Sequence, residues 1–249
     1  MSAYYDHIAK EYQHSRQLPF RLYGEVYTYL NLIGDVTGLA VLDLACGDGI
    51  YSRVLKRRGA ARVVGVDIST KMIELAQAAE SREPLGIEYL VSSAEDLGKI
   101  STFDLVVASF LLNHAQTREQ LQQMCASIAA NLKPGGRFVA VNNNQEQPPE
   151  TYPYSSIYGF RKDINGPLQP GQKITYTLIN PDSQQEVKID DYYLSTATYE
   201  EVLSEVGLEE ICWHSPQVSP TGIEKFGQDY WQSYLDYPFI LFLTCQKQN

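Results

Sequence analysis

Cysteine is scarce in this chain, whose 249 residues include only 4 of them. They stand far apart and form no C-x-x-C pair, so neither a metal site nor a redox motif is expected. Four cysteines in a chain of this length are more typical of reduced core residues than of a disulfide framework. We therefore expect a cytoplasmic protein. The cysteines are Cys46, Cys125, Cys212 and Cys245.

Positive charge and long apolar runs are also lacking. The chain has 20 Lys and Arg against 30 Asp and Glu, a net charge of −10. Nucleic-acid binding depends mainly on neutralisation of phosphates by Lys and Arg, so we expect no nucleic-acid partner. An anionic membrane surface is disfavoured for the same reason. The longest apolar stretches, 105–112 and 239–243, are too short to cross a bilayer, and residues 1–7 lack the apolar segment of a signal peptide.

Short runs rich in Val, Leu and Ile alternate with helical stretches through the first half of the chain. Alternation of this kind builds a parallel sheet covered by helices on both faces. The sequence predicts an α/β fold, a doubly wound, mostly parallel Rossmann-like sheet of seven strands. Thr117 and Gln120 fit a capping box at the start of the helix that precedes the fifth strand. The expected strands are 40–44, 62–66, 87–91, 103–108, 137–141, 210–214 and 239–245.

The second half of the chain differs from the first in composition and periodicity. Residues 142–172 are rich in Asn, Gln, Pro, Tyr and Gly without a clear period, and alternating segments at 173–178 and 187–194 predict an antiparallel hairpin. Ligands of open α/β sheets bind beyond the carboxyl ends of the strands. We therefore expect this insertion to cap the substrate, the alternative being a solvated loop with a stabilising hairpin. The expected divisions of the single domain are an N-terminal helical lid (1–36), a core (37–141), the cap (142–195) and a C-terminal helix with strands (196–249).

The most informative turn runs from Asp43 to Gly49, between the first strand and its helix. Glycines there permit a sharp turn and close approach of a ligand to the backbone. Asp67 ends the next strand, where a carboxylate can accept hydrogen bonds from both hydroxyls of an adenosine ribose. A G-x-G pair alone is weak evidence of a cofactor site, and both S-adenosylmethionine (SAM) and NAD carry such a ribose.

Two features of the sequence favour SAM over NAD. A dinucleotide site needs a third glycine, in G-x-G-x-x-G, to bring a helix N-terminus to the pyrophosphate. Ser52 stands at that position, and Asp48 would place a negative charge beside the pyrophosphate. Asp43 instead suits a cofactor that carries an ammonium group and a sulfonium charge.

Four ordered motifs resemble those of class I SAM-dependent methyltransferases, and the resemblance covers residues 4–141. It implies methyl transfer to a small molecule, with S-adenosyl-L-homocysteine as product. For the oligomeric state, we expect a monomer or homodimer. Residues 33–76 are similar in particular to toxoflavin-pathway N-methyltransferases, which implies methylation of an amine or nitrogen heterocycle. The alternatives are an O-methyltransferase, a non-catalytic SAM-binding protein and an NAD-dependent dehydrogenase. The four motifs are 43–49, 64–69 with Met72, 103–106 and 132–136.

The resemblance also implies a set of cofactor-binding residues. Asp67 would hold the ribose, while Ile68 and Met72 would flank the adenine, plain core packing being equally open for those two. Ser93 departs from the acidic residue usual in the family, which leaves the backbone N–H of Ala94 for the adenine edge. The full set is Tyr5, Tyr12, Arg21, Asp43, Ala45, Gly47, Gly49, Asp67, Ile68, Met72, Ser93, Ala94, Glu95 and Ser109.

Residues 4–13 resemble the opening "Y-D-x-I-A-x-x-Y" of the family, a helix that closes over the cofactor. Tyr5 and Tyr12 lie two helical turns apart on one face, and their rings can approach the sulfonium charge. Of the two, we favour Tyr12 as the contact. Arg21 could pair with the cofactor carboxylate, a surface arginine being the alternative.

Methyl transfer requires mainly alignment and a dry cavity, so no catalytic dyad is expected, and the sequence shows none. A hydroxyl acceptor usually needs a base, and His114 has a suitable pKa, although a structural role is somewhat favoured. We predict His114 and Tyr12 at the reacting centre. The aromatic run 226–237 could form either helix core or the wall of an acceptor pocket. The predicted acceptor site comprises His14, Asn113, His114, Tyr230, Trp231 and Tyr234.

Overall fold

The computed structural model describes residues 6, 13, 15–179 and 185–249. It contains a seven-stranded sheet in the order β3-β2-β1-β4-β5-β10-β9, in which β10 pairs antiparallel with both of its neighbours. The predicted doubly wound, mostly parallel sheet is thereby confirmed. The strands are β1 (Ala40–Leu44), β2 (Arg62–Asp67), β3 (Glu88–Val91), β4 (Phe103–Ser109), β5 (Leu132–Asn143), β9 (Leu208–His214) and β10 (Ile240–Lys247).

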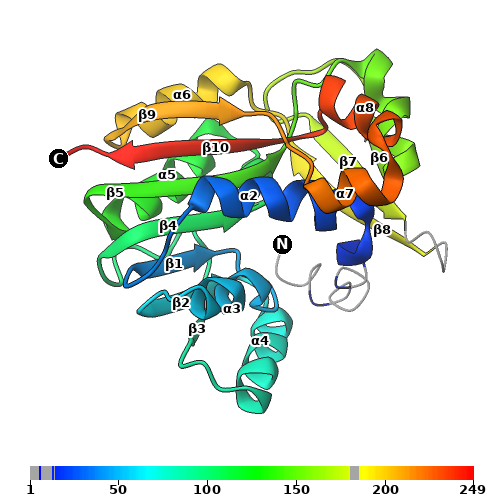
Figure 1. Ribbon diagram of the computed structural model, residues 1–249. Coiled ribbons are helices and arrows are strands. Elements are labelled where there is room, and N and C mark those ends of the chain that lie inside the picture. The colour runs from blue at the N-terminus through cyan, green and yellow to red at the C-terminus, as the bar shows by residue number, and fades with distance from the viewer. Residues whose placement is uncertain (1–5, 7–12, 14, 180–184) are drawn as a thin grey trace.

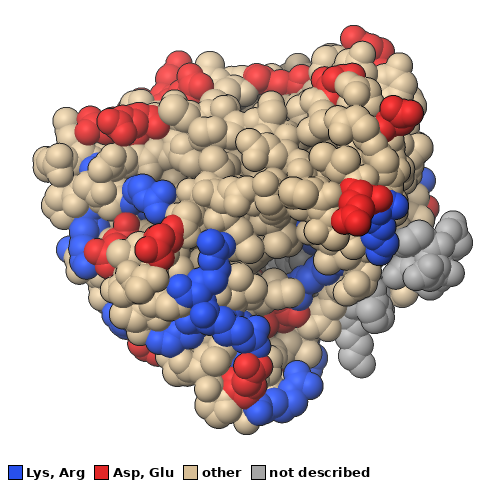
Figure 2. All heavy atoms as spheres, viewed as in Figure 1, with Lys and Arg blue, Asp and Glu red and all other residues tan. Residues whose placement is uncertain are grey.

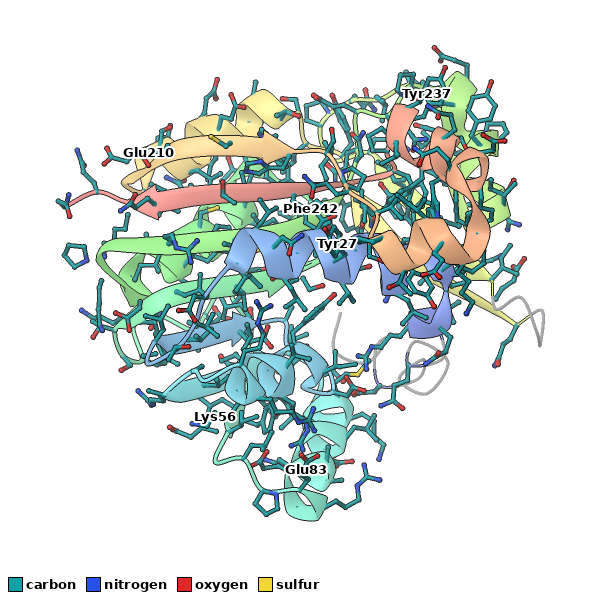
Figure 3. The ribbon with its side chains drawn as sticks, viewed as in Figure 1. Tyr27, Lys56, Glu83, Glu210, Tyr237 and Phe242 are labelled. Carbon is teal, nitrogen blue, oxygen red and sulfur yellow. The ribbon has the colours of Figure 1, made fainter. Side chains whose placement is uncertain are left out.

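Helices cover both faces of this sheet, with α2 and α3 in front and α5 and α6 behind in the view of Figure 1. Alternate residues of the central strands enter two separate apolar clusters, because successive side chains of a strand point to opposite faces. Tyr29 of α2 packs on the front face, with its ring 6.3 Å from that of Phe242, a β10 residue that is labelled in Figure 3. The helices are α2 (Val26–Ile33), α3 (Ile50–Arg57), α4 (Thr70–Arg82), α5 (Arg118–Asn131) and α6 (Thr196–Glu205).

Hydroxyl side chains begin three of these helices. Ser69, Thr117 and Ser195 each accept a hydrogen bond from the backbone N–H three residues on, which satisfies one of the free donors of the first turn. The cap predicted at Thr117 is confirmed, although the Gln120 side chain accepts from the N–H of Gln116 rather than from Thr117.

The fifth strand is longer than the predicted 137–141. Leu132 already pairs with Phe103, and the register then shifts before Arg137 pairs with Leu105. The Lys-Pro-Gly-Gly turn is therefore accommodated as an irregularity within β5, with Gly135 at φ 71°, instead of separating helix from strand.

The cap contains a second sheet of three antiparallel strands, β6 (Phe160–Ile164), β7 (Lys173–Ile179) and β8 (Glu186–Tyr192). The predicted hairpin corresponds to β7 and β8. The sequence reading missed β6, because the inward positions of this strand are held by Phe160 and Lys162. A lysine in the apolar phase hides the alternation that identifies a strand.

The remaining elements surround the cap and the front of the sheet. Within the described chain, no helix combines the length and apolar character that a membrane crossing requires. On the face shown in Figure 2, basic and acidic side chains interleave near α3 and α4, where Glu83 pairs with Arg53 and Arg57. The remaining elements, around the cap and the front of the sheet, are η1 (Ser15–Gln17), the π-helix η2 (Phe20–Glu25), η3 (Leu112–His114), η4 (Pro149–Tyr158), α7 (Pro220–Phe226) and α8 (Gln228–Asp236).

Candidate cofactor and acceptor site

Two non-glycine residues in the left-handed region mark the carboxyl ends of β1 and β4. Ala45, directly after β1, and Phe110, directly after β4, both have φ 56°. This conformation costs about 1 kcal/mol or more and persists only where the surroundings enforce it. The N–H of Phe110 donates to Val141 O at 2.8 Å, and the N–H of Cys46 donates to Val66 O at 3.0 Å. Neighbouring strands thus hold both turns at the end of the sheet.

A cavity lies between these two turns, and we call it the cofactor hollow. Its volume is about 730 Å³, including space open to solvent. Of the predicted cofactor residues, it brings together Ala45, Gly47, Asp67, Ile68, Met72, Ser93, Ala94, Glu95 and Ser109. The other residues around it are Leu44, Val66, Ser92, Phe110, Leu111, His114 and Met124.

Asp67 is held in place by backbone donors on both of its oxygens. Its Oδ2 accepts from Gly47 N–H and its Oδ1 from Ser69 N–H, each at 2.8 Å. The carboxylate is 8% exposed; burial raises its pKa, against the lowering effect of these hydrogen bonds and of His114. Each oxygen has a further acceptor position. A fixed carboxylate of this kind suits the two hydroxyls of a ribose.

Asp43 and Gly49 lie elsewhere than predicted, since neither borders the cofactor hollow. Asp43 is buried below the turn, where its Oδ2 accepts from Ser52 Oγ at 2.5 Å, and burial raises its pKa to about 7. Gly49 has φ 80°, and a Cβ there would collide with the Tyr89 hydroxyl. These two residues shape the turn from beneath instead of facing a cofactor.

A second cavity, which we call the polar chamber, adjoins the cofactor hollow. The two share Ala45, Gly47 and Ser109. Arg21 borders this chamber and is 6% exposed, so the alternative of a surface arginine is wrong. Its other lining residues are Arg16, Leu22, Glu25, Val26, Cys46, Ile50, Tyr51 and Val54.

A third cavity, the acceptor chamber, lies between the core and the cap. It shares Phe110 and His114 with the cofactor hollow, and Arg21 with the polar chamber. Most of its walls are aromatic or aliphatic, with a few polar groups, which is typical of small-molecule sites. Its lining consists of Phe20, Arg21, Phe110, Asn113, His114, Asn143, Phe160, Tyr176, Leu178, Ile189 and Ile240.

His114 is paired with an aspartate from the cap. Its Nδ1 lies 3.0 Å from Oδ1 of Asp191, which is fully buried. The other oxygen of Asp191 accepts from the side-chain amides of Asn113 at 2.5 Å and Asn143 at 2.7 Å. Burial lowers the pKa of His114, but the charge and hydrogen bonding of Asp191 and its neighbour Asp190 outweigh this, and the pKa is raised overall. The sequence showed no partner for His114, and the structure supplies one from the cap.

Asp191 is the partner of His114 that sequence reasoning missed. The strand 186–192 alternates, and its inward positions are Val187, Ile189 and Asp191. An acid in the apolar phase of an alternating strand is the signal that could have identified it, because buried carboxylates need a partner.

Three aromatic residues predicted for the acceptor site belong to the core instead. Trp231 is fully buried, donates from Nε1 to Gly222 O at 2.9 Å and stacks on Tyr158. Tyr234 is also fully buried, and Tyr230 packs edge-on against Tyr158. None of the three borders the acceptor chamber. Tyr5, Tyr12 and His14 lie outside the described residues.

Comparisons with known proteins agree with this architecture. Residues 41–136 match the sequence model of a methyltransferase domain family. The human mitochondrial ubiquinone biosynthesis O-methyltransferase is 36% identical over 115 residues, 44% of this chain and 30% of the relative. The enzyme of the same name from Coxiella burnetii (strain Dugway 5J108-111) is 34% identical over 110 residues, 43% of this chain and 45% of the relative. The chain thus matches less than half the length of these curated relatives.

Solved structures resemble nearly the whole chain. The SAM-dependent methyltransferase from Mesorhizobium loti has a TM-score of 0.63 at 20% identity, covering 94% of this chain and all of that one. The complex of DhpI with SAM and HEP has a TM-score of 0.62 at 20% identity, with 98% and 94% covered. The chain therefore has the fold of these methyltransferases, and its residues 41–136 resemble a methyltransferase domain. These relatives do not support the narrower likeness to toxoflavin-pathway N-methyltransferases.

Proposed function

We propose that the chain transfers a methyl group from SAM to a hydroxyl oxygen of a small, largely apolar acceptor. One observation carries this proposal: His114, paired with Asp191, borders both the cofactor hollow and the acceptor chamber. A base at the junction of the two cavities lies where the acceptor oxygen and the methyl donor have to meet.

The cofactor hollow fits the nucleoside of SAM, which supplies a methyl group on positively charged sulfur when bound. Asp67 would accept the ribose hydroxyls, and Ile68 and Met72 would line the adenine. Ser93 Oγ already accepts from Glu95 N–H at 3.0 Å, which orders the loop at the adenine edge. The backbone N–H of Ala94 is the proposed contact there.

Residues of the acceptor chamber would exclude water and orient the acceptor. Phe110, Phe160 and Ile240 supply apolar walls, while Asn143 holds Asp191 toward His114. In the low-dielectric space between core and cap, the charge interaction of the His114–Asp191 pair is stronger than in water.

Proton transfer explains why oxygen is proposed as the methylated atom. A hydroxyl is a weak nucleophile until a base takes its proton, whereas a neutral amine needs no base during the transfer. In the proposal, the imidazole of His114 accepts that proton, and the Asp191 carboxylate stabilises the resulting imidazolium. The O-methyltransferase names of the relatives support the same acceptor atom.

The proposal is tested with isotopically labelled SAM and a matched panel of phenols, carboxylic acids and amines built on the same ring. We expect label in phenolic ethers, with one S-adenosylhomocysteine formed per methyl transferred, and about a hundredfold or greater loss in His114→Gln. Methylation of the amines alone, or undiminished phenol methylation by His114→Gln, would contradict the proposal.

A further inference from the structure

Tyr176 borders the acceptor chamber from the cap side and has an unpartnered hydroxyl. It lies in the middle of β7 and is 1% exposed. Its hydroxyl forms no hydrogen bond with any part of the chain that the structure describes. A buried hydroxyl without a partner is costly, and such groups are rare in native proteins. Because this side chain borders a cavity, a ligand in the cavity can supply the missing partner.

Neighbours on the inner face of the cap sheet hold the ring of Tyr176 in place. Lys162 of β6 is directly paired with Tyr176 in the sheet, and its Nζ lies 5.9 Å from the centre of the tyrosine ring. That Nζ is itself fixed, since it donates to Asn144 O at 2.8 Å. On the other side, the ring of Phe160 packs against that of Tyr176 at 5.4 Å. A side chain held in this way loses little freedom when a ligand binds, which favours specific recognition.

Tyr176 lies beside the residue that pairs with the proposed base. Its partner on β8 is Ile189, and the next residue of β8 on the same face is Asp191. Diagonal neighbours of this kind are about 7–8 Å apart. The acceptor chamber measures about 350 Å³, including space open to solvent, which is near the lower end for small-molecule sites. A small acceptor that presents its hydroxyl to His114 can therefore reach Tyr176 with another part of the same molecule.

The surroundings of Tyr176 select an uncharged oxygen as its partner. Burial and then the charge of Asp191 raise the pKa of Tyr176 well above its ordinary value, so the hydroxyl keeps its proton and can donate it in a hydrogen bond. Among the described residues that line the chamber, only Arg21 and His114 can carry positive charge. Each of them lies beside a buried carboxylate, Glu25 and Asp191 respectively. An anionic substituent would thus be buried without a cation of its own, which is costly.

We propose that the Tyr176 hydroxyl donates a hydrogen bond to a second, uncharged oxygen of the acceptor, a carbonyl or ether oxygen carried by the ring whose hydroxyl is methylated. This inference rests on the proposed function and narrows its substrate class to ring hydroxyls with such an oxygen. Tyr176 is then a specificity-determining residue supplied by the cap, while the base is supplied by the core.

Steady-state kinetics with paired phenols test the inference. The meta and para hydroxyacetophenones carry a carbonyl oxygen, and the isopropylphenols have nearly the same shape without it. At one ring position or both, the preference in kcat/KM for the ketone over its isopropyl counterpart should be about five- to thirtyfold greater in the wild type than in Tyr176→Phe. Because both proteins act on the same compounds, the intrinsic reactivity of each phenol cancels in this comparison. The isopropylphenols themselves should change less than about threefold in Tyr176→Phe.

Tyr234→Phe is the matched control. Tyr234 is also fully buried, and its hydroxyl has no partner among the described residues, but it does not border the acceptor chamber. We expect its preference for the ketones to stay within about twofold of the wild type. Thermal unfolding of both variants checks that they are folded.

Three further results decide against the account at different points. Equal effects of Tyr176→Phe on the ketones and the isopropylphenols at both ring positions overturn the inference. A larger effect of Tyr176→Phe on the corresponding hydroxybenzoates than on the ketones also overturns it, because the oxygen would then be charged. If the wild-type protein methylates no phenol of any series, the proposed function itself fails, and that result is distinct from the other two.

Discussion

His114 and Asp191 meet across the boundary between the core and the cap, with Nδ1 of the imidazole 3.0 Å from Oδ1 of the carboxylate. The histidine belongs to η3, which follows β4 of the main sheet, and the aspartate belongs to β8 of the cap. Two amides of the core, from Asn113 and Asn143, hold the second carboxylate oxygen. The cap therefore contributes the aspartate that pairs with the proposed base, His114. Because of this contact, the basicity of His114 depends on the docking of the cap on the core.

The pair predicts a specific pH dependence of activity. The raised pKa of His114 means that the base is protonated at low pH, so kcat/KM should rise with pH through a value above the ordinary 6.5 of histidine. Asp191→Asn removes the charge that raises this pKa, so the rise should move to lower pH while the plateau falls by about a hundredfold. A pH–rate profile of each protein checks both effects.

Asp190→Asn is the matched control for that measurement. Asp190 is adjacent in sequence but exposed on the outer face of β8, where it pairs with Lys173 at 2.9 Å and with Thr175. We expect its profile to follow the wild type within about threefold, as surface ion pairs contribute little. An unshifted profile in Asp191→Asn would show that Asp191 has no part in setting the pKa of the base.

Gly49→Ala should destabilise the fold more than the same substitution at another glycine with positive φ. Gly49 has φ 80° and abuts Tyr89, whereas Gly98 has φ 57° with open space around its Cβ position. Backbone strain alone predicts a loss of about 1 kcal/mol in Gly98→Ala, and the added collision predicts at least about 2 kcal/mol in Gly49→Ala. Urea unfolding at one temperature measures the free energy of unfolding of both variants. Equal losses would mean that Tyr89 moves aside without a cost in stability.

Trp231 should matter for stability and not for the acceptor. Trp231→Phe keeps a ring but removes the Nε1 hydrogen bond to Gly222 O and some buried volume, so we expect a loss of about 1–3 kcal/mol in the free energy of unfolding. The KM for the acceptor should stay within about twofold of the wild type. A large change in KM at unchanged stability would contradict this prediction and indicate that Trp231 belongs to the acceptor site.

The predicted residues that the structure brings together around the cofactor hollow depend on local geometry. The end of a parallel strand and the turn after it occupy one place in every doubly wound sheet, and Gly47, Asp67 and Ser109 stand at such ends. The cofactor hollow could therefore be assembled from the order of the strands alone. Ile68 and Met72 follow from the same rule, as they come directly after β2 and in the first turn of α4.

The remaining errors come from contacts that no local pattern encodes. Asp191 reaches His114 only after the cap sheet has docked on the core. Lys162 conceals β6 because the sequence does not show whether a lysine side chain is buried or exposed. Trp231 and Tyr234 were assigned to a pocket wall on composition, which does not distinguish a ring that faces a ligand from one that faces other rings. Asp43 has the right position in the motif, but its oxygen is taken by Ser52.

Calorimetric titration of S-adenosylhomocysteine into the wild-type protein and into Asp67→Ala tests the central claim most directly. The account predicts a roughly micromolar dissociation constant for the wild type. It predicts a loss of about a hundredfold in the variant, because two hydrogen bonds to a charged carboxylate disappear. An absence of binding to the folded wild-type protein, or equal affinity of the two proteins, would contradict it.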